Sequence, residues 1–246
     1  AAGFIGHNLV YKLDNLGHYV KGIDNFTNYG IIPEQEIVAL HDARLCGMLS
    51  TTVESVDIRD GQKLHAAFAK SKPDLVIHCA AFPRAKVVDQ NPEEGCSVLT
   101  HGLINLLRCC EQYKVSKFVY ISSSMVYGDF EMYGYEDMRC NPKGIYGILK
   151  LAGEALTQDH CNRTGMEYTI IRPSAVYGPK DVLDRVVSKF LTAAMNNEEL
   201  RVCGKDEYLD FTYIDDTVDG IVRASLSTKS NGNVYNITRG NSRSLL

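Results

Sequence analysis

Short runs rich in β-branched and other apolar residues alternate with segments of helical period, and this alternation limits the folds open to the chain. The runs lie at 19–23, 52–56, 74–79, 117–122 and 167–172, and the helical segments between them include 61–70, 94–113 and 146–164. Near-continuous apolar strands separated by helices are typical of a parallel sheet covered on both faces. The sequence therefore predicts a doubly wound α/β fold.

After Pro173 the alternation becomes less regular. The pattern predicts a helix over 183–195, a strand at 200–203, a helix over 215–226 and a strand at 233–237. We expect this part of the chain to include a smaller lobe on the substrate side of the sheet.

Composition excludes several classes of function. The 26 basic and 30 acidic side chains give a net charge of −4, which argues against a nucleic-acid partner. No apolar stretch approaches the roughly 20 residues that cross a bilayer, and no charged and apolar leader opens the sequence. We therefore expect a cytoplasmic protein without a membrane partner. The eight cysteines contain no C-x-x-C pair, so neither a metal site nor a disulfide framework is predicted.

Two glycines, Gly3 and Gly6, open an amphipathic helix that is followed by a short strand ending near Asp24. Free backbone N–H groups and the positive end of a helix attract a diphosphate, and glycine lets the phosphates approach closely. A carboxylate at the end of the next strand accepts hydrogen bonds from both ribose hydroxyls of adenosine and repels a 2′-phosphate. The pattern favours NAD over NADP, although the preceding strand and the motif's first glycine are not in the sequence.

Asp57, which directly follows the predicted run at 52–56, has two interpretations. It lies at the same edge of the sheet and is placed to contact adenine, or it caps the turn before the helix that starts near Asp60.

Tyr146 and Lys150 lie one helical turn apart, so that a phenol and an ammonium group share a helix face. A neighbouring cation is expected to lower the pKa of the phenol and make it a useful acid/base group. Tyr113 and Lys117 have the same spacing, but they straddle a helix end and a strand. Only the first pair has a hydroxyl cluster, Ser122 to Ser124, at a strand end where ligands of parallel sheets bind.

Several segments together resemble one enzyme family. They are the turn AAGFIG, the HCAA segment, the run SSSMVYG, and the motifs YGILK, RPSAVYGP and LDFTYIDD. In this order they are similar to the extended short-chain dehydrogenase/reductase family, and within it to NAD-dependent nucleotide-sugar epimerases and dehydratases. The resemblance implies that residues 1–172 form a Rossmann-type NAD-binding domain lacking its first strand. It also implies that residues 173–246 form an interleaved and incomplete substrate-binding lobe.

The resemblance implies a role for each matching residue. Ser123 would hydrogen-bond the reacting oxygen, Tyr146 would be the acid/base group, and Lys150 would bind the nicotinamide ribose. The cofactor contacts implied are Gly3, Phe4, Ile5, Gly6, Asp24, Asn25, Asp57, Ile58, Ala80, Ala81, Lys150 and Pro173, and the substrate contacts are Arg84, Ser124 and Met125.

The implied reaction is epimerisation of a nucleotide-diphosphate sugar, as in a UDP-glucose 4-epimerase, through a transient keto sugar. A dehydrogenase or reductase of a sugar or another secondary alcohol, consuming NAD(P), is an alternative, and a non-catalytic NAD-binding protein is a second. The family's 4,6-dehydratases carry Asp-Glu directly after the catalytic hydroxyl. Ser124 and Met125 stand there in this chain, which argues against a dehydratase.

Three positions depart from the family pattern. Ala175 replaces a common asparagine, Leu209 replaces a phosphate-binding arginine, and Leu99 replaces another asparagine. The diphosphate would then be held by Arg84, Arg185 or Arg201, or these arginines lie on the solvated surface.

The family also commonly dimerises through two helices, here 94–113 and 146–164. We expect a homodimer in which Ile104, Leu107, Leu151 and Leu156 form the apolar contact, although the same residues could pack on the sheet.

Overall fold

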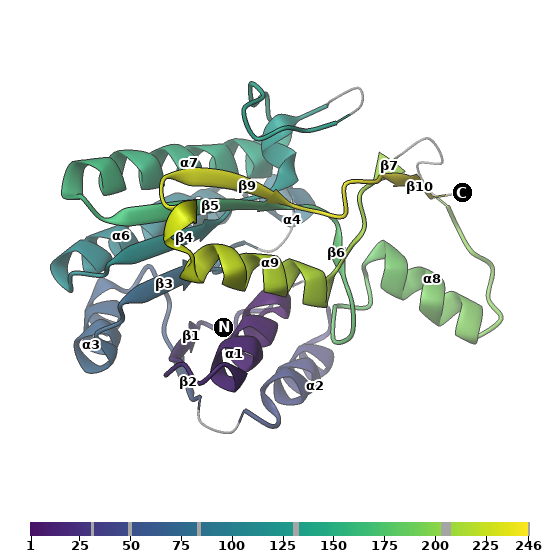
Figure 1. Ribbon diagram of the computed structural model, residues 1–246. Helices are drawn as coiled ribbons and strands as arrows, with labels where there is room; N and C mark the ends of the chain where they lie inside the picture. The colour runs from purple at the N-terminus through teal and green to yellow at the C-terminus, as the bar shows by residue number, and fades with distance from the viewer. Residues whose placement is uncertain (31, 49–50, 83–84, 130–132, 203–207, 246) are drawn as a thin grey trace.

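The computed structural model describes residues 1–30, 32–48, 51–82, 85–129, 133–202 and 208–245. Within these residues the centre of the fold is a four-stranded parallel sheet in the order β3-β4-β5-β9. Its strands are β3 (Leu75–His78), β4 (Lys117–Ile121), β5 (Glu167–Pro173) and β9 (Asn233–Ile237). The predicted α/β fold with a parallel sheet is confirmed (Figure 1).

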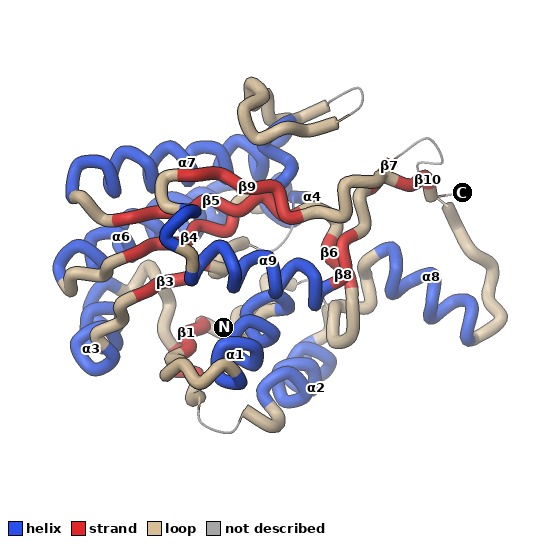
Figure 2. The backbone as a smooth tube through the Cα atoms, viewed as in Figure 1, coloured by secondary structure: helices blue, strands red, loops and turns tan. Residues whose placement is uncertain are grey.

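Three further ladders accompany this sheet. The parallel pair β1 (Gly22–Asp24) and β2 (Val53–Ser55) is not hydrogen-bonded to it. Beyond the end of β5, β6 (Val176–Tyr177) pairs in parallel with β8 (Thr212–Tyr213), and β7 (Tyr208–Leu209) pairs antiparallel with β10 (Arg243–Ser244). These last two ladders lie at the end of the sheet where β5 and β9 finish (Figure 2).

Helices cover the sheet on both faces. The α-helices are α1 (Phe4–Asn15), α2 (Glu34–Leu45), α3 (Gly61–Ser71), α4 (Ala85–Gln90), α5 (Pro92–Cys96), α6 (Leu103–Gln112), α7 (Gly144–Thr164), α8 (Val186–Met195) and α9 (Ile214–Leu226). A π-helical segment, η1 (Ser97–Gly102), joins α5 to α6, and two short 3-10 turns are η2 (Ser124–Tyr127) and η3 (Thr228–Ser230).

Successive side chains of β4 point to opposite faces of the sheet, and this explains how two hydrophobic cores form. Phe118 and Tyr120 point to one face and pack with α3, α6 and α7. Val119 and Ile121 point to the other face and pack with α1 and α9. All four side chains are at most 5% exposed, which follows from a strand that is covered on both sides.

Some sequence expectations differ from the structure. Helix α2 was not expected, because only Ile37 and Arg44 among its residues are buried and the remaining polar residues give no helical period. The strand predicted at 200–203 is not found at residues 200–202, and Cys203 lies outside the described residues. The nearest strand is β7, which pairs with β10. The first strand begins only at Gly22, so Tyr19 stays exposed.

The part of the chain after Pro173 is divided between two places. Helix α9 and strand β9 return to the main sheet, whereas α8 and the short ladders lie at its end (Figure 1). The division into domains at 172 and 173 stays a prediction.

Candidate active site

One cavity of about 650 Å³ runs along the edge where the parallel strands end. Its lining includes every described residue that the sequence predicted as a catalytic, cofactor-binding or substrate-binding residue. These residues come from segments that lie far apart in the sequence. They are Gly3, Phe4, Ile5, Gly6, Asp24, Asn25, Asp57, Ile58, Ala80, Ala81, Ser123, Ser124, Met125, Tyr146, Lys150 and Pro173. Arg84, the remaining predicted substrate contact, lies outside the described residues.

The glycine turn lies at one end of this cavity. Gly3 is the N-cap of α1, and the first N–H groups of a helix have no acceptor within the helix. A Cβ added at Gly3 would meet no atom within 4 Å, whereas one at Gly6 would come within 2.8 Å of the Ala1 carbonyl oxygen. Gly3, which lines the cavity, therefore leaves open space beside the turn, and Gly6 permits close packing against Ala1.

Asp24 and Asn25 follow β1 beside this turn. One carboxylate oxygen of Asp24 accepts hydrogen bonds from the Ala1 amino group and the Ala2 N–H, both at 2.8 Å, and the other accepts from the Phe26 N–H at 2.9 Å. Asn25 donates from Nδ2 to Asp57 at 3.1 Å. The ends of β1 and β2 are thereby linked at the mouth of the cavity.

Asp57 takes part in a dense polar cluster. Its Oδ1 accepts from the backbone N–H and from Nε of Arg59, and its Oδ2 accepts from Arg59 Nη2 and from Asn25. The hydrogen bonds from the Arg59 side chain hold the pKa of Asp57 at about 2. Asp57 thus closes a turn as well as lining the cavity, while Asp60 caps α3 by accepting from the Lys63 N–H.

The opposite half of the cavity holds the hydroxyl cluster and helix α7. Ser123 follows β4, and its hydroxyl accepts a hydrogen bond from the Met125 N–H at 3.2 Å. Lys150 donates from Nζ to the carbonyl oxygen of Ile121 at 2.8 Å and lies 5.9 Å from the ring centroid of Tyr146. The first two turns of α7 therefore face the end of β4.

Burial dominates the electrostatics of the tyrosine and the lysine. It lowers the pKa of Lys150 to about 8, since the side chain is only 4% exposed. Burial also raises the pKa of Tyr146 above its ordinary value of 10, and the charge of Arg185 and the side chain of Ser123 offset part of that rise. The expectation that Lys150 would leave Tyr146 with a lowered pKa is wrong, because desolvation of the phenolate outweighs the attraction of nearby cations.

Comparison with known proteins identifies the family. Residues 1–238 match the family described as the NAD dependent epimerase/dehydratase family. The chain belongs to this family. The predicted resemblance to extended short-chain dehydrogenases/reductases is thereby confirmed, and the predicted cofactor, NAD, is that of the family.

Individual relatives of this epimerase/dehydratase-family chain are similar along most of its length. Protein CapI of Staphylococcus aureus is 30% identical over 227 residues, which cover 90% of this chain and 66% of CapI. A UDP-glucose 4-epimerase of Mycolicibacterium smegmatis is 30% identical over 246 residues, covering 98% of this chain and 75% of that protein. The chain thus spans about two thirds to three quarters of the length of these relatives.

Solved structures agree with the fold. The crystal structure of a UDP-glucuronic acid 4-epimerase from Bacillus cereus, in complex with UDP-glucuronic acid and NAD, superposes with a TM-score of 0.88 at 29% identity. The similarity covers 99% of this chain and 77% of that structure. Among the described residues, no helix combines the length and the apolar character needed to cross a membrane.

A buried polar network behind the family's catalytic positions was not predicted. Arg172, at the end of β5, donates to Glu154 of α7 and to the hydroxyl of Tyr127. Ser122 donates to the same carboxylate at 2.5 Å, and Tyr127 donates to Asn236 of β9 at 2.7 Å. One sequence feature could have indicated this network. Glu154 lies four residues after Lys150, so both side chains are on one face of α7.

The positions that depart from the family pattern fall into two groups. Ala175 and Leu209 line the cavity, as does Arg185. The cavity lining is therefore apolar at the two positions where the family pattern has a polar residue. Leu99 is 2% exposed inside an apolar cluster with Phe82 and does not line the cavity. Arg201 is exposed and also does not line the cavity.

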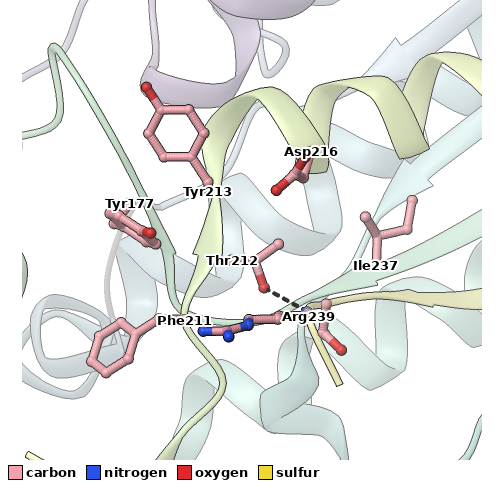
Figure 3. Close-up of a pocket in the computed structure, with 8 residues that line it drawn as sticks. Tyr177, Phe211, Thr212, Tyr213, Asp216, Ile237 and Arg239 are labelled. Atoms are coloured by element: carbon pink, nitrogen blue, oxygen red, sulfur yellow. Dashed lines mark hydrogen bonds between the residues drawn. The ribbon is translucent and has the colours of Figure 1, made fainter. Parts of the chain in front are cut away.

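A second, smaller cavity of about 330 Å³ lies beside the β6–β8 ladder (Figure 3). Tyr177 and Phe211 line both cavities, and their rings meet edge to face with centroids 6.2 Å apart. Asp216 and Arg239 line the smaller one, where the Arg239 N–H donates to the Thr212 hydroxyl. Since none of the predicted site residues lines it, the smaller cavity is not the candidate active site.

Proposed function

We propose that this chain carries out the NAD-dependent epimerisation of a nucleotide-diphosphate sugar. The observation that supports the proposal best is the convergence of two groups of residues on one cavity. The glycine turn with Asp24 lines one half, and Ser123, Tyr146 and Lys150 line the other. Family membership and the named activities of the relatives, among them UDP-glucose and UDP-glucuronic acid 4-epimerases, support the same assignment.

The residues present fit a dinucleotide. Gly3 lines the cavity and leaves the start of α1 open beside it, which a diphosphate at this place requires. Asp24 lines the cavity at the end of β1, where an adenosine ribose would lie, and each of its oxygens retains acceptor capacity. NAD, when bound, accepts a hydride from the sugar carbon and returns it.

The side chains of the other half would move the proton. Tyr146, as phenolate, takes the hydroxyl proton from the sugar while the hydride leaves the same carbon, and a keto sugar results. Ser123 donates a hydrogen bond to the reacting oxygen. Lys150 holds its ammonium group near the phenol and has two N–H donors beyond the one used by Ile121, which suit ribose hydroxyls. Hydride return to the opposite face of the keto carbon completes the epimerisation, with Tyr146 giving the proton back.

Ser124 and Met125 support an epimerase over a dehydratase. Both line the cavity directly after Ser123, and neither side chain is an acid or a base at neutral pH. Loss of water from the sugar needs an additional acid/base pair at this place, which these residues do not provide.

The decisive experiment incubates the protein with NAD and a panel of nucleotide sugars. Absorbance of reduced nicotinamide and chromatography of the sugars are followed together. We expect interconversion of two sugars without accumulation of NADH. Stoichiometric NADH with a keto product would make the protein a dehydrogenase instead. NAD binding without turnover of any sugar or other secondary alcohol would favour a non-catalytic role.

We also propose a homodimer formed through α6 and α7, but with a revised contact surface. Leu107 is 2% exposed in the core and cannot supply the contact as expected, and the partly buried Leu156 packs against the same core. Ile148 on α7 is 52% exposed and is joined there by the partly exposed Leu151. Sedimentation of the wild type and of an Ile148→Glu variant tests this, and a monomeric wild type at micromolar concentration would exclude it.

A further inference from the structure

The ring of Tyr120 packs against the side chain of Lys150. The distance from Lys150 Nζ to the ring centroid of Tyr120 is 5.3 Å, shorter than the 5.9 Å to the centroid of Tyr146. Both distances lie within the roughly 6 Å over which the face of an aromatic ring attracts a cation. The ammonium group therefore has two tyrosine rings beside it, and of these two only Tyr146 lines the cavity.

Contacts with α7 fix the position of Tyr120. The side chain is 1% exposed on the face of β4 that packs with α7, and its hydroxyl donates to the carbonyl oxygen of Lys150 at 3.5 Å. Gly153 permits this close approach, because a Cβ at that position would overlap the Tyr120 hydroxyl. The carbonyl oxygen of Ile121, the next residue of β4, accepts a hydrogen bond from Lys150 Nζ at 2.8 Å. Two successive residues of β4 thus contact the lysine.

The other ionisable groups around Lys150 offer its charge little compensation. Burial holds the pKa of His78 at about 3 and that of Cys79 at about 11, so both side chains at the end of β3 are uncharged at neutral pH. The carboxylate of Glu154 on α7 is paired with Arg172 of β5 at 2.7 Å. An aromatic face, which carries partial negative charge, is therefore a main partner of the buried ammonium group.

We infer that Tyr120 is a positioning residue, whose ring keeps the ammonium group of Lys150 charged and beside Tyr146. Lys150 is only 4% exposed, so little water solvates its charge, and a cation–π contact is strongest where water is excluded. Burial lowers the pKa of Lys150 to about 8, and the ring of Tyr120 opposes that decrease. The inference rests on the proposed function, because it gives Tyr120 a task in the proton transfer by Tyr146.

The test compares Tyr120→Leu with a matched control, Phe118→Leu. Phe118 lies two residues earlier on the same face of β4 and is fully buried in the same core, but its ring is not one of the two beside Lys150. A third variant, Tyr120→Phe, keeps the ring and loses only the hydroxyl. Carbon-13 NMR of the lysine ε-carbons measures the pKa of Lys150 in each protein, and the Lys150→Met variant identifies its resonance.

We expect Tyr120→Leu to lower the pKa of Lys150 by about one unit, a tenfold change in proton affinity, as the loss of a desolvated cation–π contact predicts. Tyr120→Phe and Phe118→Leu should keep the wild-type pKa. An unchanged or raised pKa in Tyr120→Leu overturns the inference, and so does an equal decrease in Phe118→Leu.

A second comparison applies if Tyr120→Leu does not fold. Tyr120→Phe is then compared with a protein that carries 3,5-difluorophenylalanine at position 120, because fluorine keeps the ring and withdraws charge from its face. A lower pKa of Lys150 with the fluorinated ring supports the inference, and an equal pKa overturns it.

The pH dependence of the rate separates a positioning role from a purely structural one. The proposed reactive form needs Tyr146 ionised and Lys150 protonated, so a lower pKa of Lys150 makes kcat/KM level off at a lower pH. We expect the ratio of kcat/KM in Tyr120→Leu to that in the wild type to fall about tenfold between pH 6 and pH 9. A ratio that is constant over this range would leave Tyr120 with a structural role only and overturn the inference.

The proposed function and this inference fail in distinguishable ways. If the wild type converts no nucleotide sugar, the function fails, and the titration of Lys150 still decides whether the ring of Tyr120 holds its charge. If sugars are converted and the pKa of Lys150 does not respond to Tyr120→Leu, the inference fails while the function stands.

Discussion

The carboxylate of Glu154 accepts two hydrogen bonds from the guanidinium of Arg172, at 2.9 and 2.7 Å, where both side chains are at most 5% exposed. The pair connects α7, one turn after Lys150, with the end of β5. Because Ser122 donates to the same carboxylate, the end of β4 is tied to it as well. Three elements that carry proposed site residues thus meet at one buried ion pair.

Loss of one partner of this pair is expected to destabilise the protein strongly. Glu154→Gln leaves the Arg172 cation buried without its counter-charge, and we expect a loss of about 3 to 5 kcal/mol in the free energy of unfolding. Urea denaturation measures it. Asp159→Asn, which removes the exposed carboxylate of the Arg163 pair on the same helix, is the control and should cost less than about 1 kcal/mol. Equal losses in the two variants would contradict the structural role of Glu154.

Replacing Tyr146 by phenylalanine is expected to leave NAD binding intact and to lower the rate of sugar conversion at least about a hundredfold, the usual worth of a positioned acid/base group. The comparison is with Tyr113→Phe, which loses only the hydrogen bond to the His65 carbonyl oxygen. Initial rates and NAD titrations of the two variants are measured side by side. Near-normal turnover of Tyr146→Phe would mean that another group moves the proton.

A side chain at Gly3 is expected to interfere with the cofactor much more than with the fold. The added atoms of Gly3→Val meet no protein atom within 4 Å at a residue that lines the cavity, so we expect NAD affinity to fall more than about tenfold, with a loss of unfolding free energy limited to the helix-cap effect of about 1 kcal/mol. Gly61→Val, at the start of α3, also enters open space, but outside the cavity. It should bind NAD as the wild type does, and an equal loss there would refute the assignment of the turn.

The pH dependence of kcat/KM should reflect both buried groups. The reactive form needs Tyr146 as phenolate and Lys150 as ammonium. The pKa of Tyr146 lies above 10 and that of Lys150 at about 8, so this form is always a minor one. Its fraction rises about tenfold per pH unit below pH 8 as the phenol ionises, and then levels because Lys150 loses its proton in step. A rate that keeps climbing beyond pH 9 would show that Lys150 stays charged or is not required.

The sequence predicted the main sheet and the composition of the candidate site for the same physical reason. Apolar strands separated by helices pair in parallel, and ligands bind where such strands end. Asp24 and Ser123 were predicted at strand ends and Gly3 and Tyr146 near the starts of helices, which favours one common site. Their spacing along the chain and the resemblance to the family were sufficient to name them.

Other features depend on contacts that no local pattern contains. Arg44 is buried because it bonds to the carbonyl oxygen of Lys180, 136 residues away, and α2 therefore has no apolar face by which to recognise it. The partnership of Glu154 with Arg172 is likewise a matter of tertiary packing. The direction of the Tyr146 pKa shift depends on how deeply the phenol is buried, and the sequence does not state that depth.

The hydrogen bonds of Arg44 have a consequence for the residence time of the cofactor. This one side chain fastens the backbone beside the glycine turn at Ala2 to the backbone after β6 at Lys180. Separating these two walls would strand a buried cation and two carbonyl groups, so the cofactor end of the cavity resists opening. The epimerase proposed above would reduce and reoxidise its dinucleotide within each cycle, and a wall closed in this way suits a cofactor that stays bound.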